Sequence, residues 1–167
     1  MLIKHIERLE NFSDLRDEIY SIIQSVGFQN NQIACQGLDE NQTDWYSGIG
    51  PLDDLEEKNE EKYCFINETL KGSYLEQLIK RFRSFRTRIM CMPPRKCYSV
   101  HKDFTKRIHI PIITNDQCWM IWPTDKECFK LLEGRIYLTD TTKLHTYLNG
   151  HETLERIHLV MAVKDSF

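Results

Sequence analysis

The stretch that decides the fold runs from residue 98 to residue 111 and reads YSVHKDFTKRIHIP. It places two histidines, an aspartate and an arginine in a segment that otherwise has the pattern of two short β-strands. Residues two apart in a strand point to the same face, so His101 and Asp103 offer a nitrogen and an oxygen to one point. The same alternation places Arg107 beside His109 and turns the isoleucines of this segment to the other face. A neutral imidazole beside a carboxylate begins a divalent-metal site that lacks a third ligand.

The second half of the chain has the pattern of a β-protein. Short apolar or alternating runs are separated by turn signals that contain Pro, Gly, Asn and Asp. Strands are expected at residues 87–92, 97–101, 107–113, 118–122, 135–139, 144–148 and 155–163. Amphipathic helices are expected over residues 13–26 and 73–82. This order predicts a mainly β fold, a sandwich or barrel, with the amino-terminal helices packed outside it.

Length and composition favour a single domain over residues 1–167, with residues 1–85 as helical and loop support and residues 86–163 as the β core. The net charge of −3 gives no indication of a nucleic-acid or membrane partner. The amino terminus lacks the apolar run of a signal peptide, and no stretch approaches membrane-spanning length, so we expect a soluble, cytoplasmic protein. The cysteines form no C-x-x-C pair and are expected to be reduced. Nothing in the sequence indicates an oligomeric state.

Two charged stretches each allow two interpretations. The acidic stretch 53–61 closes a loop-rich section that also contains Trp45 and Tyr46. We favour a solvated surface excursion; the alternative is a lid or substrate loop, because long loops with aromatic residues often bind ligands. The basic stretch 80–88 has interleaved aromatic residues. We favour a helix end followed by a strand whose arginines face water; the alternative is a nucleic-acid patch.

The third metal ligand has three later candidates, His145, His151 and His158. His151 directly follows Asn149-Gly150, the strongest short-range signal for a β-hairpin, and is discounted because it falls in that turn. A hairpin centred there puts Arg156 on the face of His145, one diagonal step away, about 7–8 Å between backbones. His158 shares the face of Arg156 within its own strand, so both histidines stay open on this reasoning.

The arginines near these ligands predict a bound anion. A guanidinium keeps its charge inside a protein, so burying one without a partner costs several kcal/mol. Arg107 follows the first two ligands, and Arg156 lies beside His145 in the expected hairpin. A dicarboxylic acid that chelates the metal at one end and pairs with Arg156 at the other would meet both requirements.

Three motifs carry a resemblance to a known family. Met92-Pro93-Pro94, then His101-Lys102-Asp103, then Arg107-Ile108-His109-Ile110-Pro111 is similar to the aspartyl/asparaginyl β-hydroxylase-like group of iron(II)- and 2-oxoglutarate-dependent oxygenases. That group includes the bacterial cis-proline hydroxylases. Further along its sequence, the group has a pattern of Gly, Asp, His, Asn and Arg. This pattern resembles Gly134, Asp140, His145, Asn149 and Arg156 of this chain. The resemblance covers about residues 86–163, and the presence of Asp103 favours the branch with three metal ligands.

The resemblance implies a double-stranded β-helix, a jelly roll of two sheets with the metal inside. It implies that iron(II) is held by His101, Asp103 and His145. Arg156 is expected to pair with the distal carboxylate of the cosubstrate 2-oxoglutarate, while Arg107 and His109 contact that cosubstrate nearer the metal. The implied reaction consumes O2, releases succinate and CO2, and hydroxylates an unactivated carbon, with ascorbate as a possible supporting reductant.

We expect the substrate to be an amino acid, either free or as a residue in a peptide or protein. Two other function classes remain alternatives. One is a non-catalytic jelly-roll module that binds a metal or an organic acid. The other is an oxygenase that acts on nucleic acid through the basic stretch, which the low net charge disfavours. Metal analysis, 2-oxoglutarate titration and a salt-dependent binding assay would separate these classes.

Overall fold

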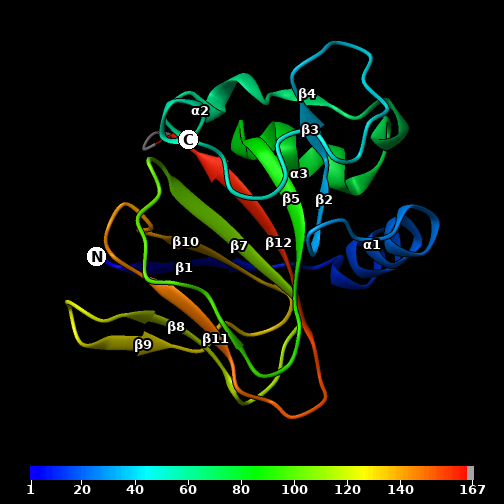
Figure 1. Cartoon of the computed structure of the whole chain (residues 1–167). Coiled ribbons are helices and arrows are strands. Elements are labelled where there is room, and N and C mark those ends of the chain that lie inside the picture. The colour runs from blue at the N-terminus through cyan, green and yellow to red at the C-terminus, as the bar shows by residue number, and fades with distance from the viewer. Residues whose placement is uncertain (165–167) are drawn as a thin grey trace.

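Two antiparallel β-sheets face each other and form the body of the molecule (Figure 1). The computed structural model describes residues 1–164. The larger sheet has six strands in the spatial order β1 (Ile3–Arg8), β10 (Arg135–Thr139), β7 (Lys106–Ile113), β12 (Arg156–Val163), β5 (Phe85–Met92) and β2 (Gln32–Ala34). The smaller sheet has four strands in the order β6 (Lys96–Cys97), β11 (Thr146–Asn149), β8 (Cys118–Trp122) and β9 (Glu127–Phe129). The mainly β jelly-roll fold expected from the sequence is confirmed.

Two helices cover the outer face of the larger sheet, as expected. α1 (Phe12–Val26) and α3 (Tyr74–Phe82) pack their apolar stripes into one buried cluster with the outward residues of β5, β7 and β12. Ser73 caps the start of α3, because its hydroxyl accepts the Glu76 N–H at 3.0 Å, and the Glu76 carboxylate in turn accepts the backbone N–H of Gly72 at 2.7 Å. α1 ends at Gly27, whose φ of +77° is readily adopted by glycine. Local capping and the buried stripe therefore explain both helices.

The strand β7 shows the alternation that the sequence predicted. Ile108 and Ile110 are fully buried in the cluster beneath the helices. Arg107 and His109 point the other way, into the space between the two sheets, where they line a cavity. Because both faces of this strand are covered, its polar side chains are as inaccessible as its apolar ones: Arg107 is 2% exposed and His109 is 7% exposed.

The amino-terminal half contributes more to the sheets than its sequence pattern indicated. β1 and β2 form the two edges of the larger sheet, and β2 lies within a section expected to be loop. The same half holds a two-stranded sheet of β3 (Gln36–Gly37) and β4 (Phe65–Ile66), the short helix α2 (Asp54–Lys58) and two 3-10 helices at Glu60–Lys62 and Glu68–Leu70.

The expected hairpin at Asn149-Gly150 is wrong. β11 pairs with β6 and β8 in the smaller sheet, whereas β12 pairs with β5 and β7 in the larger sheet. The chain therefore crosses from one sheet to the other at this point. Asn149 is fully buried and holds the crossover, because its amide nitrogen donates to the carbonyl oxygens of Met92, Pro93 and Leu154 at 3.2, 3.3 and 2.9 Å.

All six cysteines are free thiols, three of them buried and three exposed. Within residues 1–164, no helix combines the length and the apolar character needed to cross a membrane.

Candidate active site

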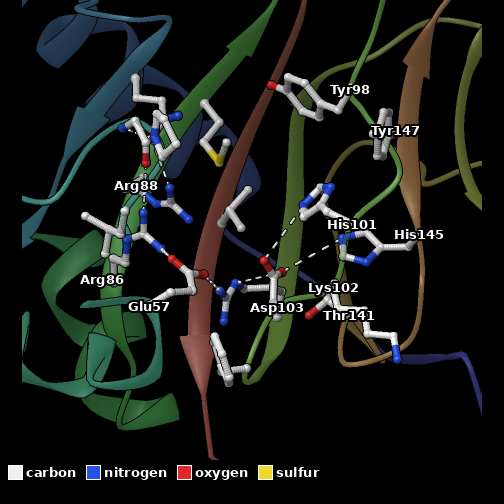
Figure 2. Close-up of a pocket in the computed structure, with 18 of the residues that line it drawn as sticks. Glu57, Arg86, Arg88, Tyr98, His101, Lys102, Asp103, Thr141, His145 and Tyr147 are labelled. Atoms are coloured by element: carbon white, nitrogen blue, oxygen red, sulfur yellow. Dashed lines mark hydrogen bonds and ion pairs between the residues drawn. The ribbon is translucent and has the colours of Figure 1, made fainter. Parts of the chain in front are cut away.

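His101, Asp103 and His145 come together at one point between the sheets (Figure 2). One ligand atom from each residue lies within 4.8 Å of the other two. The Nε2 atom of His101 is 3.8 Å from Oδ1 of Asp103, and the Nε2 atom of His145 is 3.9 Å from Oδ2 of the same carboxylate. Two imidazole nitrogens and a carboxylate are donors for divalent transition metals. The structure thus unites two ligands from the loop before β7 with a third from the residue that precedes β11.

Backbone contacts hold the two histidines in position for a metal. Nδ1 of His101 lies 2.8 Å from the carbonyl oxygen of Ser99, and Nδ1 of His145 lies 3.0 Å from that of Lys143. A carbonyl can only accept, so each Nδ1 carries the proton and each Nε2 presents its lone pair toward Asp103. The pKa of His145 is lowered by burial, which favours the neutral imidazole that a metal requires. The donor set therefore fits a divalent metal in protonation as well as in identity.

Asp103 is kept ionised by its neighbours. Burial alone would raise the pKa of Asp103, but the positive charge of Arg107 and the adjacent histidines outweigh this effect and hold the pKa below its ordinary value. The Nε atom of Arg107 lies 3.3 Å from Oδ2 of Asp103. Arg107 therefore orients the carboxylate ligand from behind.

The terminal nitrogens of the Arg107 guanidinium contact two further carboxylates of the protein. Its terminal nitrogens lie 2.8 and 2.9 Å from the two oxygens of Glu60 and 3.2 Å from Glu57, and one of them also contacts Thr105. Glu60 also contacts Arg86 at 3.2 Å and is only 1% exposed. We call Glu57, Glu60, Arg86 and Arg107 the carboxylate–arginine cluster. The expected contact of Arg107 with a cosubstrate stays a prediction; within residues 1–164 its charge already has partners.

This cluster corrects the favoured interpretations of both charged stretches. The acidic stretch 53–61 is not simply a solvated excursion, because Glu57 and Glu60 turn inward and the residues before them line the cavity. The favoured water-facing orientation of the arginines in stretch 80–88 is wrong for Arg86 and Arg88, which are 3% and 7% exposed. Residues 80–82 do form the expected helix end. With these two arginines turned inward, Lys80, Arg81 and Arg83 are the basic residues of this stretch that stay exposed.

Arg156 lines the cavity and has no carboxylate partner among residues 1–164. It is 1% exposed, its Nε atom has no hydrogen-bond partner there, and its guanidinium lies 4.3 Å over the ring of Tyr147. His109 and His158 complete this corner, with their Nδ1 atoms 3.4 Å apart. Burial, reinforced by the charge of Arg156, lowers the pKa of His109 to about 3 and lowers that of His158 well below its usual value. Both imidazoles are therefore neutral, and Arg156 is the charged group of this corner.

The triad and Arg156 line one cavity of about 500 Å³. This volume is within the range of about 300–1,000 Å³ that is usual for small-molecule sites. Both sheets contribute to its walls, as do the loop before α2 and the segment from Tyr98 to Phe104. The cavity thus offers metal donors on one wall and an unpaired cation on another.

A family model described as aspartyl/asparaginyl beta-hydroxylase matches residues 9–166. The chain belongs to this family. Membership confirms the expected enzyme class, a 2-oxoglutarate-dependent hydroxylase, and extends the similarity over the amino-terminal half. The search of curated proteins found no match.

Solved structures support the fold of this hydroxylase family member. The viral collagen prolyl hydroxylase vCPH from Paramecium Bursaria Chlorella virus-1 aligns with a TM-score of 0.56 and 13% identity, covering 98% of this chain and 91% of that one. Its complex with 2-oxoglutarate aligns with a TM-score of 0.54 and 15% identity, covering 98% and 97%. AviO1 from Streptomyces viridochromogenes Tue57 gives 0.54 and 10%, covering 99% and 90%. At these identities, the likeness concerns the fold alone.

The structure brings all six site residues expected from the sequence to this cavity: His101, Asp103, Arg107, His109, His145 and Arg156. Sequence reasoning missed Arg88, Glu57, Glu60 and Tyr147. For Arg88 a weak signal existed, because a strand over residues 87–92 puts it on one face with Met90 and Met92. Which face pointed inward depended on pairing that the sequence did not reveal.

Proposed function

We propose that this hydroxylase binds iron(II) through His101, Asp103 and His145 and 2-oxoglutarate between that metal and Arg156. The reaction would convert 2-oxoglutarate, O2 and a substrate C–H group into succinate, CO2 and a C–OH group. Bound iron(II) would supply the redox chemistry that couples these two oxidations. The substrate class we favour is an amino acid, as a residue in a polypeptide or free.

The observation that carries this proposal is that the triad and the unpaired Arg156 line one cavity. A buried guanidinium without a counter-ion is unfavourable unless a ligand supplies the anion. A dicarboxylate that chelates a metal at one end would present its other carboxylate to such a cation, in the bidentate geometry that guanidinium groups favour. The 2-oxoglutarate complex of vCPH, which shares this fold, adds support.

Each of the remaining residues would have a definite task. Arg107 would hold Asp103 in its ionised form and fix its direction, because it lies 3.3 Å from that carboxylate. His109 and Tyr147 would form an uncharged, buried wall beside the cosubstrate, since their rings lie 6.5 Å apart in a stacked arrangement. A buried site strengthens the pairing of a carboxylate with Arg156.

Exposed apolar side chains near the triad favour a polypeptide substrate over a free amino acid. Tyr98, Val100, Phe104 and Leu144 are between 36% and 52% exposed, and they lie within three residues of a triad histidine or aspartate. Tyr98 and Phe104 also line the cavity. Apolar side chains gathered at the mouth of a site are typical of surfaces that contact another chain.

The test measures succinate release by purified protein supplied with iron(II), 2-oxoglutarate, ascorbate and O2. We expect slow turnover alone, faster turnover with a suitable peptide, and loss of turnover in the His145→Ala variant. Binding of Mn(II) and of 2-oxoglutarate is measured separately by calorimetry, since a binding module would bind both without releasing succinate. If wild-type protein binds neither, the proposal is wrong.

A further inference from the structure

Four arginines line the cavity, and they fall into two classes. Arg86 and Arg107 have carboxylate partners in the carboxylate–arginine cluster. Arg88 and Arg156 have no carboxylate within ion-pair distance in the described chain. The proposed function gives an anion to Arg156 and leaves Arg88 without one. Arg88 is therefore the buried arginine of the cavity that remains to be explained.

Arg88 is buried, and part of its guanidinium group is unpaired within the described part of the chain. The residue is 7% exposed, and its Nε atom has no hydrogen-bond partner among residues 1–164. One terminal nitrogen donates to the side-chain oxygen of Gln32 at 3.0 Å, and that oxygen also lies 3.2 Å from the backbone nitrogen of Gly50. Burial and the nearby charges of Arg86 and Arg107 lower the pKa of Arg88 to about 9. A bound anion would relieve all of these penalties.

Arg88 and Arg156 occupy different parts of the cavity. Arg88 of β5 pairs with Val160 of β12, whereas Arg156 of β12 pairs with Met92 of β5. The two arginines are thus separated by four residues along adjacent strands, or about 13 Å between backbones. The charges that act on Arg88 belong to the triad and the carboxylate–arginine cluster, while Arg156 acts on His109 and His158. One small diacid bound at the metal would therefore not account for both.

We propose that Arg88, held by Gln32, binds a carboxylate group of the substrate that is hydroxylated. This inference rests on the proposed function, which assigns Arg156 to the cosubstrate. Figure 2 shows Arg88 across the cavity from the triad, beside Arg86. A carboxylate is the anion chosen because an amino-acid substrate offers one, either as its free α-carboxylate or as an acidic side chain. Gln32, fixed through Gly50, would keep the guanidinium facing the cavity.

The test uses full-length protein loaded with Mn(II) and 2-oxoglutarate and titrated with matched pairs of probes. Acetate is compared with acetamide, and doubly capped aspartate with doubly capped asparagine. Free L-aspartate and L-alanine form a further arm that separates an α-carboxylate from an acidic side chain. The readout in the wild type is the 15N–1H resonance of the Arg88 side-chain Nε, assigned by its loss in Arg88→Gln. The affinities of the wild type and of all variants for the same probes are compared by calorimetry.

We expect carboxylate probes to shift this resonance with dissociation constants at least tenfold lower than those of their amide counterparts. Arg88→Gln should weaken carboxylate binding at least tenfold, Arg88→Lys should retain part of it, and the exposed Arg83→Gln should retain all of it. The affinity for 2-oxoglutarate should change less than about twofold in Arg88→Gln but at least tenfold in Arg156→Gln.

Three outcomes overturn the assignment. The first is that acetate and acetamide bind with equal affinity. The second is that Arg88→Gln binds carboxylates as tightly as the wild type does. The third is that Arg88→Gln loses as much affinity for 2-oxoglutarate as Arg156→Gln does. If the wild-type protein fails to bind Mn(II) or 2-oxoglutarate, the proposed function fails instead. In that case the acetate and acetamide titrations of metal-free protein still decide whether Arg88 is an anion site.

Discussion

His101 and His145 exchange a reciprocal pair of backbone hydrogen bonds, with each N–H donating to the other's carbonyl at 3.0 and 2.9 Å. This isolated bridge fastens the loop before β7 to the residue before β11. The two imidazole rings, with centroids 4.5 Å apart, are therefore positioned by the backbone before any metal arrives. Such preorganisation lowers the entropy cost of assembling a metal site from distant segments.

Removal of one triad histidine should abolish metal-dependent activity. We expect His145→Ala to weaken Mn(II) binding by at least about 100-fold, since even outer-shell partners of metal ligands contribute about 10–100-fold. Succinate release should fall to background. The exposed His5→Ala serves as the control and should leave both properties intact. Equal Mn(II) affinities in the two variants would refute the triad.

Arg107→Met should destabilise the protein severely. The substitution leaves Asp103 without its arginine partner and leaves Glu57 and Glu60 with Arg86 alone. Breaking a buried ion pair costs about 3–5 kcal/mol. The free energy of unfolding, measured with urea, should fall by that amount. In the control, Arg81→Met removes an exposed contact with Glu7 and should cost less than about 1 kcal/mol. Similar losses in both variants would show that the carboxylate–arginine cluster contributes little.

Arg156→Met should behave in the opposite way. The free energy of unfolding of the ligand-free protein should equal or exceed that of the wild type, because replacing an uncompensated buried charge by an apolar side chain removes a desolvation cost. The lost contact with Tyr147 offsets about 0.5–2 kcal/mol of this gain. The affinity for 2-oxoglutarate should fall by about 30-fold or more, corresponding to about 2 kcal/mol. A variant as unstable as Arg107→Met would contradict this account.

Asn149→Ala should loosen the crossover between the sheets. Its amide group satisfies the carbonyl oxygens of Met92, Pro93 and Leu154, and losing these bonds should lower the free energy of unfolding by about 2–4 kcal/mol. The control is Asn59→Ala, which removes an exposed amide donation to a single carbonyl and should cost under about 1 kcal/mol. Comparable urea midpoints for the two variants would rule out a special role for Asn149.

Acidification should destabilise the metal-free protein through His158. The pKa of His158 in the folded state lies well below the ordinary value of 6.5, so the unfolded chain binds more protons as the pH falls below about 6.5. Each such histidine lowers the free energy of unfolding by about 1.4 kcal/mol per pH unit in that range. The His158→Met variant should lose the part of this dependence that comes from the uptake of one proton on unfolding. Parallel pH profiles for wild type and His158→Met would contradict the prediction.

The parts of the site that local periodicity determines were predictable. Arg107 and His109 alternate with isoleucines in β7, so strand geometry alone gives their directions. His101 and Asp103 lie in the loop before β7, so the strand alternation expected for them is not what brings them together. The choice of His145 and the position of Arg156 followed from the family resemblance. Sequence reasoning placed His145 and Arg156 near each other through a hairpin that does not exist, and their meeting in one cavity results from the packing of two sheets.

The parts that depend on long-range pairing were not predictable. An Asn-Gly pair indicates a turn but does not say which sheet the next strand joins. The arginines of β5 were expected to face water because nothing local shows that both faces of that strand are covered. Glu60 lies in an acidic stretch, and its burial results from Arg86 and Arg107, which follow it by 26 and 47 residues. A sequence pattern indicates a charge but not its distant partner.

The two groups that would bind 2-oxoglutarate, the metal and Arg156, are held by opposite sheets. His145 directly precedes β11 of the smaller sheet, and Arg156 begins β12 of the larger sheet. A molecule bound at both ends would therefore link the two sheets and restrict their motion relative to each other. When 2-oxoglutarate binds, the hydrogen-exchange rates of the amide protons in β11 and in β12 should then fall together, although no hydrogen bond joins those strands directly.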